Sequence, residues 1–452
     1  MTFTGYMKKI SAIITALSTG AALTGCTFGA SIDTLMTPPK LSVEQEQIYS
    51  KLTDPTGAST ISLKYPKSGK YLSAFIIEDI DDDGGNEAIV FYERKNHAAD
   101  ENPLRINVLD KEGDEWKSVY DTAAEGSEIE EVIISKLGSN KRTNIIVGTS
   151  IINRSEKNVS IYNYSNGELM KQIFDAPASS DEPYSYIGVK DLDSDGQNEF
   201  LRFTGASNGT PATANVYTLD KNGNFNNASI GLSENFGDFT INYGRLPDGN
   251  TGIYIDAVSG TGTIQSDVVY MQDGSLQRFF STPEEASVTE RSAGCTCFDV
   301  DGDGSIEIPV QKAAPGYEYY DDSEKLKLTE WMKINSDMKL QRCYVSYYSL
   351  NDGYIFIFPD RWVGKVTLKT DLINDEIVFC AYDKKIIGRD LMNIFCAEDA
   401  PSCEDRLMGE YMLMHTKGDS SYLAYIPNNT GTDGDGLSIT AGEAAIGFRT
   451  RD

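Results

Sequence analysis

The feature that most constrains the fold is a nine-residue acidic pattern that occurs three times. It reads DIDDDGGNE from Asp79, DLDSDGQNE from Asp191 and DVDGDGSIE from Asp299. Each copy lies between two short apolar stretches, such as AFIIE and AIVFY around the first copy. Short apolar runs bounded by turn residues are typical of β-strands. We therefore expect each acidic segment to be a loop that joins two strands.

Two further segments keep the strand-loop-strand pattern without the acids. KLGSNKRTNIIVG begins at Lys136 and RLPDGNTGIYI begins at Arg245. The five copies start at 79, 136, 191, 245 and 299, so their spacings are 57, 55, 54 and 54 residues. A fixed period of this length is the signature of a repeat architecture. In the second copy, Ser139 to Arg142 replace the acids, and a lysine amine there could take the place of a cation.

Each repeat also carries a hairpin pattern after its loop. Alternating strands closed around a glycine turn predict a β-hairpin. The turn glycines of the first four repeats are Gly113, Gly167, Gly223 and Gly274, and the fifth turn lies near Asn335 to Asp337. Four short strands in about 55 residues match the size of a β-propeller blade. We therefore predict a mainly β protein with a β-propeller of about five blades over residues 60–345, to which terminal strands could add a sixth.

The acidic pattern resembles the FG-GAP/VCBS type of repeat found in integrin-like propellers and in many bacterial surface proteins. The resemblance rests on D-x-D-x-D-G-x-x-[DE] with flanking strands, and its period covers about 285 residues. It implies calcium-binding loops that hold up to three Ca²⁺ ions. The implied ligands are Asp79, Asp81, Asp83, the Gly85 carbonyl and Glu87; Asp191, Asp193, Asp195, the Gln197 carbonyl and Glu199; and Asp299, Asp301, Asp303, the Ser305 carbonyl and Glu307.

Other interpretations of the acidic loops were weighed against calcium. An EF-hand needs an acid at position twelve, where this chain has Val90, Arg202 and Val310. Magnesium, which prefers octahedral geometry and retained waters, stays an alternative, as do metal-free turns with solvated acids. Catalytic carboxylates are a third alternative, but a glycosidase uses one pair in different environments rather than three similar loops.

The N-terminus has the layout of a secretory signal. Residues 7–26 read MKKISAIITALSTGAALTGC, with two lysines, a short apolar run and a small-residue ending. The LTGC ending resembles the lipobox of bacterial lipoproteins, and the chain resembles lipoproteins of Clostridia-type bacteria. This implies diacylglycerol on Cys26 and a lipid anchor at the extracytoplasmic face of the cell membrane. Residues 1–26 would be the signal peptide and 27–59 a tether with a short helix after Ser42.

Composition excludes several classes of function. The formal net charge of −28 repels phosphate backbones, so nucleic-acid binding is not expected. Histidine occurs only at 97 and 415, and both positions are interpreted as solvated surface residues rather than zinc ligands or triad members. Six cysteines remain besides Cys26. A Cys396–Cys403 disulfide and buried free thiols are both left open.

The repeat period stops after residue 345. Residues 346–452 are predicted to form a separate small α+β domain, with Trp362 in its core and Thr440 as the cap of a short helix.

The sequence contains no nucleophile elbow, phosphate loop, zinc motif or dinucleotide fingerprint. We therefore expect that the protein is not an enzyme but a calcium-binding propeller that acts as a binding or structural module for a surface protein, peptide or glycan. The alternative is a surface enzyme that acts on glycans through a site in the propeller channel.

Overall fold

The structure is a computed structural model. It describes residues 41–53, 61–95, 102–165, 167–172, 174, 183–207, 209–232, 239–258, 262–428 and 433–451. The predicted signal peptide, Cys26 and His97 lie outside the described residues. Among the helices that are described, none has both the length and the apolar character needed to cross a membrane.

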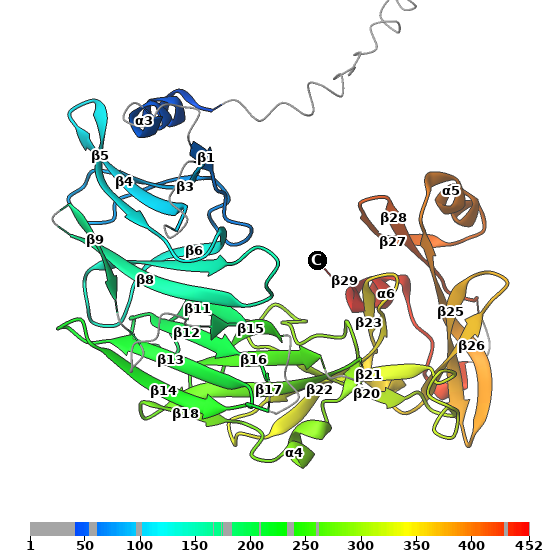
Figure 1. Ribbon diagram of the computed structural model, residues 1–452. Coiled ribbons are helices and arrows are strands. Elements are labelled where there is room, and N and C mark those ends of the chain that lie inside the picture. Colours follow the sequence, from blue (N-terminus) through cyan, green and yellow to red (C-terminus); the bar gives the residue numbers. More distant parts are fainter. Residues whose placement is uncertain are drawn as a thin grey trace, which may run out of the picture.

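The described residues form six antiparallel sheets that follow one another in chain order. Figure 1 shows them along an open arc, with the first sheet at one end and the sixth at the other. The predicted fold class is confirmed: the protein is mainly β, with five consecutive blade-like sheets followed by a smaller region that contains a sheet and helices.

The first sheet receives the N-terminal helix α3 (Val43–Thr53). Its strands are β1 (Ile61–Leu63), β2 (Phe75–Glu78), β3 (Glu87–Arg94), β4 (Leu104–Glu112) and β5 (Glu115–Ala123). The helix begins where expected, because Ser42 Oγ accepts from the Gln45 N–H at 3.1 Å while Gln45 Oε1 accepts from the Ser42 N–H at 3.0 Å. Ile48 and Leu52 of α3 are buried against Trp116 of β5.

The second to fourth sheets repeat this plan. The second contains β6 (Glu128–Lys136), β7 (Thr143–Ser150), β8 (Lys157–Ser165), β9 (Glu168–Gln172) and β10 (Pro183–Tyr184). The third contains β11 (Tyr186–Lys190), β12 (Glu199–Thr204), β13 (Thr213–Leu219) and β14 (Phe225–Gly231). The fourth contains β15 (Phe239–Arg245), β16 (Thr251–Val258), β17 (Thr263–Gln272), β18 (Ser275–Arg278) and β19 (Arg291–Ser292), and helix α4 (Pro283–Ser287) follows β18.

The predicted hairpins are present, and their turn glycines adopt backbone angles that favour glycine. Gly113, Gly167, Gly223 and Gly274 have φ of 71°, 77°, 86° and 73°. A positive φ places these residues in the left-handed region, where a side chain would be strained. They lie in the turns β4–β5, β8–β9, β13–β14 and β17–β18.

The hydrophobic core consists of layers between successive sheets. Strand β7 is buried along its whole length. Its Ile145 and Val147 pack with the first sheet, whereas Ile146 between them packs with the third. Successive side chains of a strand point to opposite faces, so a strand covered on both sides needs a continuous apolar run. This explains why runs such as NIIVG follow the loops instead of an alternating pattern.

The fifth sheet combines repeat and C-terminal residues. Its strands are β20 (Ile308–Ala313), β21 (Lys327–Ile334), β22 (Leu340–Ser349), β23 (Tyr354–Ile357) and β29 (Phe448–Thr450), in that order. The expected division at residue 346 falls inside β22. Strand β29 returns from the C-terminus and pairs with β23, so the C-terminal region completes the fifth sheet.

The sixth sheet lies beside the fifth. It contains β24 (Val366–Asp371), β25 (Glu376–Asp383), β26 (Ile386–Ala397), β27 (Met412–Lys417) and β28 (Ser420–Tyr425); the nearby helices are η2 (Asp360–Trp362), α5 (Ala400–Met408), η3 (Asp433–Asp435) and α6 (Ala441–Gly447). Trp362 is fully buried between the two sheets, and its indole N–H donates to the Leu437 carbonyl at 2.8 Å. Its interpretation as a core residue is confirmed. Thr440 caps α6 as predicted, through a reciprocal capping box with Glu443.

The cysteines of the described chain are all free thiols. Cys295, Cys297 and Cys380 are buried, and Cys396 and Cys403 do not form a disulfide. Of the two alternatives left open by the sequence, the structure has the free thiols.

Candidate metal centres

Each acidic segment directly precedes a buried strand of its sheet, β3, β12 or β20. Residues 79–86 join β2 to β3, and residues 191–198 join β11 to β12. The third segment follows Phe298, which forms an isolated antiparallel bridge with Glu307 just before β20. The two acid-free segments also join first and second strands, β6 to β7 and β15 to β16. The predicted strand-loop-strand placement is therefore present in four repeats, and in the fifth an isolated bridge takes the place of the first strand.

The first aspartate of each motif folds the loop around itself. Asp79 accepts hydrogen bonds from the N–H groups of Asp82 at 2.7 Å and Gly84 at 3.1 Å. Gly84 has a φ of 91°, and only glycine adopts that angle without strain. The same contact recurs at the other loops, from Gly196 to Asp191 at 3.0 Å and from Gly304 to Asp299 at 2.7 Å.

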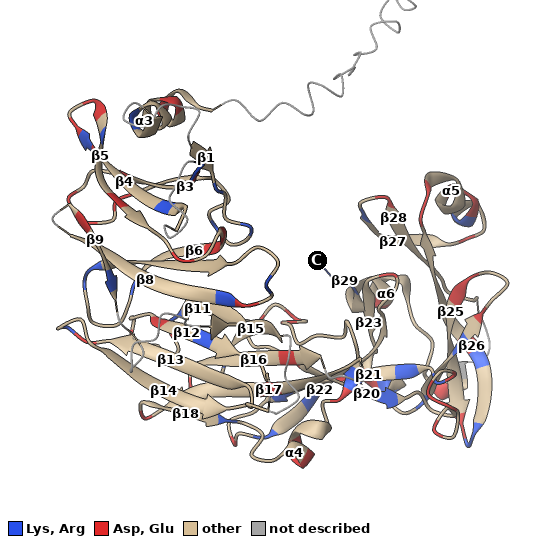
Figure 2. Cartoon of the chain, in the orientation of Figure 1, with Lys and Arg blue, Asp and Glu red and all other residues tan. Residues whose placement is uncertain are grey.

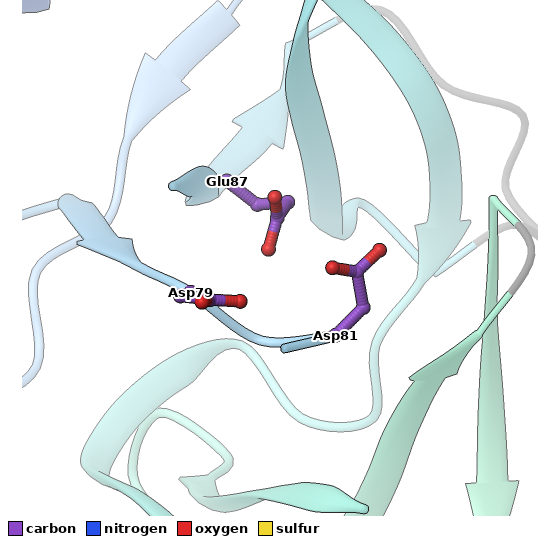
Figure 3. A group of neighbouring side chains, drawn as sticks. All are labelled: Asp79, Asp81 and Glu87. Atoms are coloured by element: carbon purple, nitrogen blue, oxygen red, sulfur yellow. The ribbon is translucent and has the colours of Figure 1, made fainter. Parts of the chain in front are cut away.

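The glutamate at the ninth position points back into the loop. Glu87 is the first residue of β3 and only 1% exposed. Its Oε2 accepts from the Ile80 N–H at 2.8 Å. Its Oε1 is buried and has no hydrogen-bond partner among the described residues. Figure 3 shows this carboxylate directed toward Asp79 and Asp81.

The other two glutamates have the same position and hydrogen bond. Glu199 is the first residue of β12, is 3% exposed and accepts from the Leu192 N–H at 2.9 Å. Glu307 is fully buried and accepts from the Val300 N–H at 2.7 Å.

The loops bring most, but not all, of the predicted ligands together. Three groups have carboxylate oxygens that all lie within 4.8 Å of one another: Asp79, Asp81 and Glu87; Asp191, Asp193 and Glu199; and Asp299, Asp301 and Asp303. Asp83 and Asp195 lie outside these groups and accept from the N–H groups of Gly85 and Gln197, each at 2.7 Å. Ser305 likewise donates its N–H to Asp303 at 2.8 Å. In the third loop, the predicted ligand Glu307 lies outside the group.

Burial shifts the pKa values of the first two glutamates. Burial, with a smaller contribution from the Asp81 carboxylate, raises the pKa of Glu87 to about 7 against the opposing hydrogen bond from Ile80. Burial raises the pKa of Glu199 to about 7 in the same way, with a contribution from Asp193. A buried carboxylate beside other carboxylates favours its neutral form unless a cation compensates the charge. A divalent cation among the three oxygens would supply that compensation.

The third loop already contains a cation, which the sequence analysis did not identify. The Lys333 ammonium of β21 lies 2.9 Å from Asp301, 2.5 Å from Asp303 and 2.9 Å from Glu307. The Lys333 hydrogen bond lowers the pKa of Asp303. Lys333 stands 26 residues after Glu307 in the sequence, and only the pairing of β21 with β20 brings it to the loop.

The comparisons with known proteins give no family. No family model matches the chain, and no curated protein matches it. Solved structures do match, at low similarity. They include Saccharomyces cerevisiae Sqt1, with 10% identity over 73% of this chain and 77% of that one and a TM-score of 0.31. A GH43 β-1,3-galactosidase has 9% identity over 62% and 96% of the two chains and a TM-score of 0.26. An α-L-arabinanase of Penicillium chrysogenum has 12% identity over 81% and 98%, also with a TM-score of 0.26.

These matches contradict one prediction. The sequence led to the expectation that the protein is not an enzyme, but glycosidases are among the solved structures found to be similar. That exclusion is therefore wrong as stated. Carboxylate chemistry on glycans leaves no short sequence motif, so the absence of such motifs did not exclude an enzyme. At TM-scores of 0.26 to 0.31, the matches do not assign a reaction or a substrate to this chain.

The role of Glu87 can be tested by the substitution Glu87→Gln. The amide keeps an oxygen for the Ile80 N–H but removes the charge, so we expect the number of bound calcium ions to fall by one. We also expect the metal-free protein to become more stable, because a neutral side chain replaces a buried carboxylate. Isothermal titration calorimetry and urea unfolding in chelator measure the two effects.

The matched control is Asp82→Asn in the same loop. Asp82 is exposed, pairs with Lys136 at 2.8 Å and lies outside the group of three carboxylates. This control should leave the calcium stoichiometry unchanged. Loss of an ion in Asp82→Asn but not in Glu87→Gln would contradict the assignment.

Proposed function

We propose that the protein is a calcium-binding lipoprotein of the extracytoplasmic membrane face, in which metal ions hold the loops that join the strands of its sheets. The observation that carries the proposal is the buried, unpartnered Oε1 of Glu87, directed at the carboxylates of Asp79 and Asp81. The donors are all oxygens, which hard cations prefer. Calcium fits better than magnesium because it accepts several carboxylates in an irregular arrangement, whereas magnesium keeps waters and near-octahedral geometry.

The cellular location is proposed from the N-terminal sequence. Residues 7–26 form a secretory signal that ends in LTGC, and Cys26 would carry the diacylglycerol. Outside the cell, calcium is abundant, and extracellular modules bind it with dissociation constants of roughly 10⁻⁴–10⁻³ M. A loop with only a few charged ligands is sufficient in that setting.

The sheet array would then present a surface to a partner. The net charge of −28 disfavours anionic surfaces and nucleic acids, and favours a cationic or neutral protein, peptide or glycan. The similarity of the acidic loops to the FG-GAP/VCBS type of repeat supports a role at the cell surface.

A glycan-acting enzyme is the second candidate function. The observation that favours it is a pocket of about 540 Å³ between the fifth and sixth sheets, rather than in a propeller channel. Tyr347, Asp352, Asp375, Glu398 and Asp399 are among the residues that line it. Glycosidases place two carboxylates across a sugar, and a tyrosine ring offers a stacking surface.

The enzymatic candidate predicts hydrolysis of at least one member of a polysaccharide panel. Asp352→Asn and Glu398→Gln would then each reduce the rate at least tenfold, because each removes a carboxylate from the pocket. Release of reducing sugar is the measurement, and Asp82→Asn is the control of equal charge change. A panel with no hydrolysis in the presence of calcium would remove this candidate.

The calcium proposal predicts that chelation lowers the melting temperature of the purified ectodomain and that calcium restores it. A ligand that binds only the folded state stabilises by about 2.7 kcal/mol per site at a concentration of 100 times its dissociation constant. Magnesium at the same concentration should restore less. Scanning calorimetry and elemental analysis measure these effects. An unchanged melting temperature in chelator, together with no bound calcium, would overturn the proposal.

The lipid anchor predicts that Cys26→Ser releases the protein from the membrane fraction. The thiol is the acceptor of the diacylglycerol, so the variant should also lose incorporation of an alkyne-tagged fatty acid. Cys343→Ser is the matched control, because Cys343 is an exposed thiol in β22. Membrane retention of both variants would contradict the anchor.

A further inference from the structure

The residue opposite the ninth-position glutamate differs among the three acidic loops. Ala88 pairs with Leu109, Phe200 with Tyr217 and Ile308 with Met332. One step further along each antiparallel register, Asp110 faces Glu87, Thr218 faces Glu199 and Lys333 faces Glu307. All three facing residues are half-buried. One structural position therefore carries a negative, a neutral and a positive side chain.

Lys333 lies among the carboxylates of the third loop. Its ammonium group contacts carboxylates at the third, fifth and ninth positions of the loop at 2.5–2.9 Å. Tyr344 of β22 donates a further hydrogen bond to Asp301 at 2.8 Å. Figure 2 shows basic residues on both β20 and β21. The third loop thus has an ammonium group and a phenol hydroxyl of its own sheet beside its carboxylates.

The acid-free loops fit the same scheme. In the acidic repeats, the residue before the motif pairs with the glutamate, as Glu78 does with Glu87. The same register pairs Ser135 with Asn144 of β7 and Gly244 with Gly252 of β16, so Asn144 and Gly252 take the place of the glutamate. Asn163 lies opposite Asn144, and one step along the register from the Ile253–Val269 pair Tyr270 lies opposite Gly252, so both residues at this position and both residues facing them are neutral.

We propose that the residue facing the ninth-position glutamate determines which cation each loop holds. With Asp110 or Thr218 at this position, the acidic loops of the first and third sheets can bind calcium. In the fifth sheet, the Lys333 ammonium group takes the place of the calcium ion. This inference rests on the proposed calcium binding, and it replaces three equivalent ions by two ions and one lysine. Calcium could enter the third loop only if Lys333 left, which would break three ion pairs at once.

Electrostatics also predicts different calcium affinities for the first and second acidic loops. Charges close to each other in a partly buried site interact strongly, so one nearby carboxylate changes the affinity for a cation measurably. Asp110 adds a negative charge beside the first group, and Thr218 adds none beside the second. The first loop should therefore bind calcium more tightly than the second.

The decisive experiment counts calcium ions in the ectodomain by calorimetry and by elemental analysis after dialysis. The unchanged protein should bind two ions. Lys333→Thr, which copies the residue of the third sheet, should bind three. Lys312→Thr is the matched control, because Lys312 is an exposed lysine of the adjacent strand β20 that pairs with Glu330, and it should still bind two.

The reciprocal variant brings the lysine to the third sheet. Thr218→Lys should reduce the number of bound calcium ions from two to one. It should also reduce the rise in melting temperature that calcium causes. Asn227→Lys places the same charge at an exposed position of the adjacent strand β14 and should keep two ions. Asp110→Thr should weaken the tighter site at least threefold while the count stays at two.

The outcomes separate this inference from the proposed function. If the unchanged protein binds no calcium, the proposed function fails. If it binds three ions, or if folded Lys333→Thr still binds two, the inference fails while calcium binding stands. Circular dichroism establishes folding of each variant, and if Lys333→Thr does not fold, the Thr218→Lys count decides, with two ions overturning the inference.

Discussion

The need to compensate one buried glutamate at the start of a strand underlies the loop chemistry of this protein. In the acidic repeats, that glutamate begins or immediately precedes a strand whose next residues are buried on both faces by neighbouring sheets. Glu87, Glu199 and Glu307 are 1%, 3% and 0% exposed. Each uses one oxygen to fix the backbone of its loop, at Ile80, Leu192 and Val300. A carboxylate buried in this way favours its neutral form unless a cation compensates its charge.

Sheet stacking explains why the five loops recur at a regular spacing along the chain although their residues differ. Each apolar layer joins two consecutive sheets, so the spacing of the second strands is set by packing and not by the loops. A loop therefore needs only to close the turn between two strands. In the acid-free loops, Asn144 and Gly252 at the position of the glutamate achieve this without charge. In the third acidic loop, Lys333 achieves it through ion pairs within its own sheet, whereas the first and second acidic loops keep carboxylates without a lysine at the facing position.

The sequence predicted the local and periodic features and missed those that depend on pairing between distant strands. The 54- to 57-residue spacing and the turn glycines predicted five sheets and their hairpins, because both signals lie within a few residues. Lys333 was missed because its relation to Glu307 depends on the register of β20 and β21. The end of the repeat region was placed at residue 345, yet β22 runs through it and β29 joins the same sheet from nearly 100 residues away. Strand returns of that kind have no local signal.

The exclusion of enzymes failed for a related reason, since carboxylates that act together on a glycan need not be neighbours in the sequence.

Lys333 lies in the sheet that contacts the C-terminal region. This sheet packs against the sixth through an aromatic cluster around Trp362, and it takes in the C-terminal strand β29. Arg451 after β29 donates to Gly294 and to Thr296, in the segment just before the third acidic loop. If that loop depended on calcium, a fall in calcium concentration would loosen the C-terminal strand and the sixth sheet together. An ammonium group on β21 is present at every calcium concentration, so this junction stays closed. Under the proposed calcium binding, the loops that respond to the ion are those of the first and third sheets, which join neither the sixth sheet nor the C-terminal strand.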